Sequence, residues 1–165
     1  MDTEYIIKNI NANAGVFKAL FKDVSDEEAV WKPVPEKWSL LEIVNHLYDE
    51  EREDFRARVD SALHKKEYGM IDPQGWVSER KYCEREFRVS VNNFLEERRM
   101  SVQWLEKLEA PDWELPFEHP KIKMSAGEML ANWLAHDYRH IEQIVRTRHA
   151  YLGSITGDGR LRYAG

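Results

Sequence analysis

Residues 38 to 47 read Trp38-Ser-Leu-Leu-Glu-Ile-Val-Asn-His-Leu47, and this stretch contains the clearest helix start in the chain. Ser39 and Glu42 have the spacing of a capping box, in which two side chains satisfy backbone N–H groups of the first helical turn. A stripe of apolar residues at helical spacing follows and predicts a helix to about His64: Leu40, Ile43, Val44, Leu47, Phe55, Val59 and Leu63.

The same kind of start recurs near the C-terminus. Ser125 and Glu128 form a second predicted capping box, and the helix that follows is expected to continue to about His149. Apolar stripes predict two further helices, over about residues 3–21 and 78–108. No segment shows the two-residue alternation that is typical of a half-buried strand.

Four amphipathic helices predict an all-α protein, a four-helix bundle. We expect one bundle domain over residues 1–152 and a short irregular tail over 153–165, where four glycines occur. A chain of 165 residues is long enough to bury a sizeable core without disulfides. The sequence does not settle the order in which the helices pack.

The composition narrows the possible partners. Charged residues make up 33% of the chain and the net charge is −6, which argues against a nucleic-acid partner. No apolar run approaches the roughly 20 residues that span a membrane, and the N-terminus lacks the pattern of a signal peptide. Cys83 is the single cysteine, expected to be buried and inert in the third helix. Together these features predict a cytoplasmic protein.

The predicted last helix contains a pair of histidines. It reads Trp133-Leu-Ala-His136-Asp-Tyr-Arg-His140-Ile-Glu-Gln-Ile144, so His136 and His140 share one helix face with apolar neighbours. Two neutral imidazoles at this spacing can bind one metal ion. They can also be core histidines that form a hydrogen bond with a neighbouring residue. The spacing alone favours this second interpretation.

A third ligand is needed for a catalytic site, and His46 is the best candidate, because it leans toward the core two turns into its helix. Glu50 follows His46 by one turn, and Asp137 follows His136 directly. Either carboxylate is a candidate general base, fourth ligand or partner that fixes an imidazole ring; the alternative is a solvated surface charge.

Other charged and aromatic residues have less specific interpretations. The runs 49–54 and 96–99 contain both signs of charge and are expected to be exposed, salt-bridged faces. Four aromatic residues fall in predicted loops and are expected to line a pocket mouth or to contact a second copy of the chain: Tyr68, Trp76, Trp113 and Phe117.

The stretch around His46 resembles the second helix of the DinB-like superfamily, also described as DinB/YfiT-like. Phe117-Glu-His-Pro120, residues 125–130 and the segment from His136 to Ile144 resemble its fourth helix. The resemblance covers nearly the whole chain in helix count, order and spacing. Relatives often have a glycine before the last helix, where this chain has Lys121-Ile-Lys123.

This resemblance implies a four-helix bundle in which His46, His136 and His140 hold a divalent metal, with Zn, Ni or Fe as candidates. It also implies a homodimer, a small-molecule substrate and, in some relatives, the use of low-molecular-weight thiols. The leading hypothesis is therefore a metal-dependent hydrolase or thiol transferase. The alternative is a non-enzymatic, metal-containing binding or stress-response module.

Overall fold

The computed structural model describes residues 1–119, 123–161 and 163. Every regular secondary-structure element in these residues is a helix. The elements are α1 (Thr3–Phe21), α2 (Asp26–Val30), α3 (Leu40–Glu50), the π-helical turn η1 (Glu51–Phe55), α4 (Arg56–His64), α5 (Trp76–Glu79), the 3-10 turn η2 (Tyr82–Glu84), α6 (Phe87–Glu106), α7 (Ala126–Thr156) and the 3-10 turn η3 (Asp158–Arg160). No described helix is long and apolar enough to cross a membrane.

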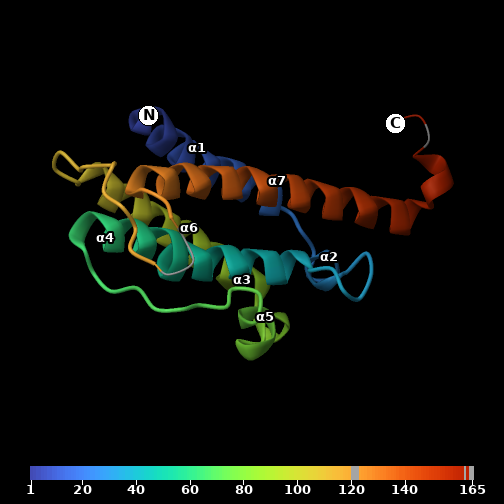
Figure 1. Cartoon of the computed structure of the whole chain (residues 1–165). Helices are drawn as coiled ribbons and strands as arrows, with labels where there is room; N and C mark the ends of the chain where they lie inside the picture. Colours follow the sequence, from blue (N-terminus) through green and yellow to red (C-terminus); the bar gives the residue numbers. More distant parts are fainter. Residues whose placement is uncertain (120–122, 162, 164–165) are drawn as a thin grey trace.

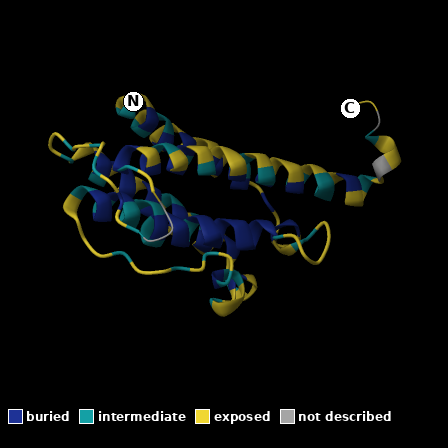
Figure 2. Cartoon of the chain, viewed as in Figure 1, coloured by how far each residue is buried: buried dark blue, intermediate teal, exposed yellow. Residues whose placement is uncertain are grey.

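The long helices form the predicted four-helix bundle, with α3, η1 and α4 acting as one bent helix (Figure 1). α1 packs on α6 and α7, α3 packs on α6, and α4 packs on α7. α1 and α7 run in one direction while α3–α4 and α6 run in the other, because the segment between α4 and α5 returns along the outside of the bundle. Figure 2 shows buried residues on the inner helix faces and exposed ones outside.

The core consists of two apolar clusters along the bundle. One cluster includes Ile10, Val59, Val102 and Trp133, and the other is built around Phe17, Leu40, Leu47, Phe94 and Ile144. Both predicted capping boxes are present, at Ser39 and Ser125, and they set the starts of α3 and α7. The two helices that carry the histidines are thus placed by local signals.

The second helix is not a regular α-helix throughout. Its inward positions at Leu47, Glu51, Phe55 and Val59 are each four residues apart, whereas an α-helix has 3.6 residues per turn. The π-helical turn η1 absorbs the extra residue, with the N–H of Arg56 donating to the carbonyl of Glu51. This turn keeps four successive positions on the inner face.

The third helix begins later than Ser78, the predicted start. Lys81 has a left-handed backbone (φ 49°), which separates α5 from η2, and Glu86 then caps α6 by accepting from the N–H groups of Arg88 and Val89. Cys83 lies in η2 and is exposed, so the prediction of a buried thiol was wrong. The apolar periodicity had extended the helix through a segment that turns back instead.

The last helix ends later than predicted, at Thr156 instead of about His149. It crosses the boundary that we expected at Gly153, which is buried inside the helix. The rings of Tyr151 and Trp31 pack 5.5 Å apart, which fixes this end of α7 to the segment before α3. Gly157, with φ 85°, then ends the helix, and the 3-10 turn η3 follows.

The loop aromatics pack on the protein's own core. Trp76 and Phe117 are buried, and Tyr68 and Trp113 are half-buried against the cluster that contains Ile10. The expectation that they line a pocket mouth or contact a second copy was therefore wrong for the two buried rings. Their burial explains how connections of this length are held against the bundle.

Candidate metal centre

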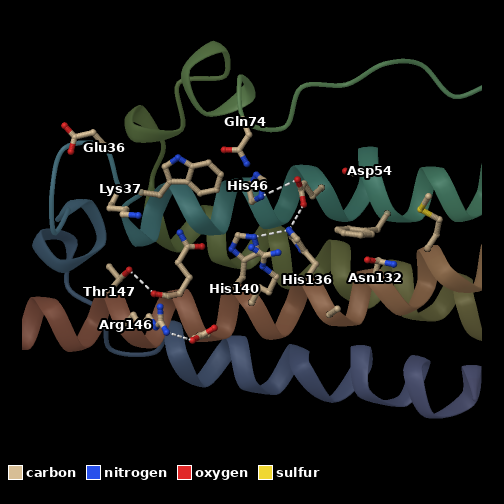
Figure 3. A pocket seen from close by; sticks show the side chains of 18 of the residues that line it. Glu36, Lys37, His46, Asp54, Gln74, Asn132, His136, His140, Arg146 and Thr147 are labelled. Atoms are coloured by element: carbon tan, nitrogen blue, oxygen red, sulfur yellow. Dashed lines mark hydrogen bonds and ion pairs between the residues drawn. The ribbon is translucent and has the colours of Figure 1, made fainter. Parts of the chain in front are cut away.

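The structure brings the three histidines together between α3 and α7. One ring nitrogen from each of His46, His136 and His140 lies within 4.8 Å of the other two. The Nε2 atoms of His136 and His140 are 2.9 Å apart. The ring centroid of His46 lies 5.7 Å from that of His136 and 5.0 Å from that of His140. α3 and α7 run in opposite directions, and the cluster lies near the middle of both (Figure 3).

Glu50 belongs to the same cluster. Its Oε2 is 2.6 Å from Nε2 of His136, and its Oε1 is 3.3 Å from Nε2 of His46. The carboxylate is therefore shared between histidines of two different helices. Glu50 is buried, and burial raises its pKa above the ordinary value of a glutamate.

The three imidazoles are neutral at physiological pH. Burial lowers the pKa of His46 and of His136 to about 4 and that of His140 to about 3, because an imidazolium ion loses its hydration there. A neutral imidazole keeps a lone pair on one ring nitrogen, which is the form that binds a metal.

Aromatic neighbours orient the rings. The indole of Trp38 packs on His46 with centroids 4.7 Å apart, and the ring of Phe55 packs 4.8 Å from His136. The buried Nδ1 of His46 has no hydrogen-bond partner among the described residues. The polar contact of this ring is therefore at Nε2, with Glu50. Aromatic packing at His46 and His136, together with the contacts of Glu50, sets the direction of these two rings.

A pocket of about 1200 Å³ opens over the cluster. The loop before α3, the C-terminal half of α3 and the turn η1 form one wall, and the exposed side of α7 forms the other (Figure 3). His46, His136, His140 and Glu50 all line it, together with apolar side chains such as Phe55 and Met129. A pocket of this size accepts a small molecule next to the histidines.

The structure does not bring Asp137 to this pocket. Asp137 is fully buried on the opposite side of α7, where Arg98 donates two hydrogen bonds to it (2.6 Å and 2.7 Å) and Asn13 donates a third. Both oxygens are therefore occupied. Of the two carboxylates considered from the sequence, only Glu50 faces the histidines.

Asp137 is part of a buried polar layer that the sequence analysis missed. Arg98 donates two further hydrogen bonds to Glu51, each 2.8 Å long, and the indole N–H of Trp133 also donates to Glu51. Asn13, Glu51, Arg98 and Asp137 thus supply one polar residue from each long helix of the bundle. They lie between the two apolar clusters on every helix.

A sequence signal for this layer existed. Arg98 is four residues from Phe94 and four from Val102, so it occupies a core position of α6. Glu51 has the same relation to Leu47 and Phe55. The runs 49–54 and 96–99 were expected to be exposed, but Asp49, Glu50, Glu51, Asp54, Glu97 and Arg98 are buried.

The π-helical turn separates the roles of two consecutive glutamates. Glu50 ends α3 and faces the histidines, whereas Glu51 begins η1 and contacts Arg98. In the same way His136 faces the pocket while the next residue, Asp137, contacts Arg98. Arg98 therefore binds Glu51, which follows Glu50, and Asp137, which follows His136. Through these two ion pairs it links η1 to α7 next to the histidine cluster.

The chain belongs to the DinB superfamily, whose family model matches residues 10–144. A solved structure with a similar fold is YfiT from Bacillus subtilis, described as a probable metal-dependent hydrolase with an unusual four-helix bundle topology. The two share 16% sequence identity with a TM-score of 0.78, over 89% of this chain and 86% of YfiT. A search of curated proteins finds no match.

The residues present fit a divalent metal ion. Nitrogens bound to one tetrahedral ion at about 2.0–2.1 Å lie roughly 3.3 Å from one another. Here the three ring nitrogens lie within 4.8 Å of one another, and those of His136 and His140 are 2.9 Å apart. All three rings are neutral, and the pocket leaves one side of the cluster open. Three protein ligands and an open position are typical of catalytic rather than structural zinc sites.

Proposed function

We propose that this protein is a metal-dependent hydrolase that acts on a small molecule. The observation that carries the proposal is the convergence of three neutral imidazoles and one buried carboxylate at the wall of a pocket of about 1200 Å³. YfiT, which has a similar fold, is described as a probable metal-dependent hydrolase, and this supports the proposal.

His46, His136 and His140 would hold the ion, with Zn, Ni or Fe as candidates because imidazole suits all three. When bound, a divalent ion acts as a Lewis acid and brings the pKa of a water molecule in its open position to about 7. The neutral imidazoles leave its full charge in place. Trp38 and Phe55 would keep two of the rings in the binding orientation.

Glu50 would act as the general base. It lies within contact distance of two of the three histidines and faces the same pocket. Burial raises its pKa, which brings it closer to the pH at which a base accepts and returns protons efficiently. Glu50 would accept a proton from the attacking water at one carboxylate oxygen and then donate it to the leaving group.

Two alternative functions would use the same histidines. The same three ligands would serve a transferase that uses a low-molecular-weight thiol. A non-enzymatic module would need a closed site, which Glu50 could complete as a fourth ligand. The open pocket favours an enzyme over a closed site.

The first test is metal content. The purified protein, incubated with Zn²⁺, Ni²⁺ or Fe²⁺ and desalted, is expected to retain about one ion per chain by mass spectrometry, and His140→Ala is expected to retain none. The loaded protein is then assayed against ester, amide and lactone panels with and without added thiol. Hydrolysis without thiol supports the proposal; turnover only with thiol, or no metal uptake, contradicts it.

A further inference from the structure

Two cationic side chains in the pocket are not neutralised by any described carboxylate. Lys37, in the loop before α3, and Arg139, on α7, both line the pocket beside the histidines. Neither side chain forms an ion pair or hydrogen bond with another described residue. Figure 3 shows Lys37 on the wall that faces α7, so the two cations come from opposite sides of the pocket.

Three of the four acidic residues that line the pocket contact other side chains. Glu142 pairs with Arg146 at 2.6 Å, Asp54 pairs with Arg58, and Glu50 contacts the histidines. Glu36 is exposed, and Figure 3 shows its side chain directed away from the histidines. Lys37 and Arg139 are therefore the two cations of the pocket lining that have no carboxylate partner among the described residues.

Both cations lie close to the metal-binding cluster. Arg139 follows His136 by about one turn on the same face of α7. Lys37 directly precedes Trp38, whose ring packs on His46. Both cations therefore line the same pocket as the histidines.

We propose that the pocket selects a small molecule that carries a carboxylate at the end away from the reacting bond. This inference rests on the proposed function, because it assumes that the reacting bond lies at the histidines. Arg139 would bind the carboxylate through its planar guanidinium, and Lys37 would contribute a second positive charge. Phe55 and Met129 offer apolar contact for the part of the molecule in between.

The test uses two hydroxamate probes with the protein loaded with Co²⁺, whose visible spectrum reports binding. The monohydroxamate of succinic acid has a terminal carboxylate, and its matched amide is neutral. We expect the carboxylate probe to bind about tenfold more tightly than the amide, since two partly exposed charge pairs contribute. This ratio is expected to fall to about one in Lys37→Gln/Arg139→Gln and to decrease with added salt.

Arg146→Gln is the matched control, because Arg146 also lines the pocket but is already paired with Glu142. It is expected to keep the wild-type ratio. If the amide binds but the ratio is near one in the wild type, or is unchanged in the double variant, the selectivity inference is wrong and the metal site stands. If neither probe binds the loaded protein, the inference and the proposed function fail together.

Discussion

At the scale of single residues, Glu50 and Asp137 show how two carboxylates next to metal-ligand candidates acquire different environments. Glu50 shares its oxygens with His46 and His136 at the pocket, whereas both oxygens of Asp137 accept from Arg98 in the core. Each follows a histidine in the chain, by four residues and by one. Only the helix face separates the two roles.

Substitution of Glu50 by Gln is expected to separate a base from a ligand. If Glu50 is the general base, the variant retains metal affinity within a few fold and loses about 10²–10⁴ in kcat. The measurements are metal titration and steady-state kinetics. A large loss of metal affinity would instead identify Glu50 as a fourth ligand and contradict its role as the base. Asp54→Asn, at the same pocket, is a control for simple loss of charge.

The buried histidines predict how the stability of the metal-free protein depends on pH. In the unfolded chain they titrate near 6.5, but in the folded state at about 4, 4 and 3. Between pH 6.5 and 4 the unfolded state therefore binds more protons, and the free energy of unfolding falls as the pH falls. Each histidine contributes up to about 1.4 kcal/mol per pH unit in that window.

Urea unfolding in EDTA at a series of pH values tests this, and His140→Gln is expected to show a shallower fall than the wild type. The comparison between proteins is needed because Asp54, whose pKa burial raises to about 6, contributes with the opposite sign. Equal slopes in both proteins would contradict the prediction.

At the scale of helices, Arg98 ties η1 to α7. Arg98→Met would leave Glu51 and Asp137 buried without a cation, so we expect a loss of about 3–5 kcal/mol in the free energy of unfolding. Arg148→Met is the control: Arg148 also bonds a carboxylate and a backbone carbonyl of α1, but its side chain is 35% exposed. Its expected loss is at most about 1 kcal/mol.

Urea unfolding of both variants measures these losses, and similar values for the two would contradict the special role of Arg98. The triple variant Arg98→Met/Glu51→Gln/Asp137→Asn removes all three charges. It is expected to recover part of the loss, because no buried carboxylate is then left without its cation.

At the scale of the whole molecule, metal binding should stabilise the fold because the ligands come from two helices, α3 and α7. A divalent ion at about 100 times its Kd adds about 2.7 kcal/mol, which raises the Tm of a chain of this size by roughly 5–10 °C. Differential scanning calorimetry with and without EDTA measures the shift. His46→Ala and His140→Ala are expected to abolish it; a shift that persists in both places the ion elsewhere.

The assembly of the molecule is a separate question. The homodimer that the family resemblance implies stays a prediction, and light scattering on the purified protein tests it. Tyr138, Val145 and Leu152 are exposed at seven-residue intervals along α7. They are the first positions to substitute if a dimer is found.

The sequence by itself determined the helices and the metal-ligand candidates. Apolar periodicity and the capping boxes at Ser39 and Ser125 are local signals, and both boxes are present in the structure. His136 and His140 share a face by helix geometry alone. The core-facing position of His46 in its helix made it the third candidate, the family motif supported it, and the family itself is confirmed by the match over residues 10–144.

Only the tertiary structure decided how these parts meet. The helix directions, the π-helical turn at Glu51 and the polar layer around Arg98 depend on contacts between segments far apart in the chain, which periodicity does not encode. For the same reason the charged run at 49–54 is mostly buried although its composition predicted a surface. Whether a carboxylate faces a pocket or an arginine depends on which helix packs beside it.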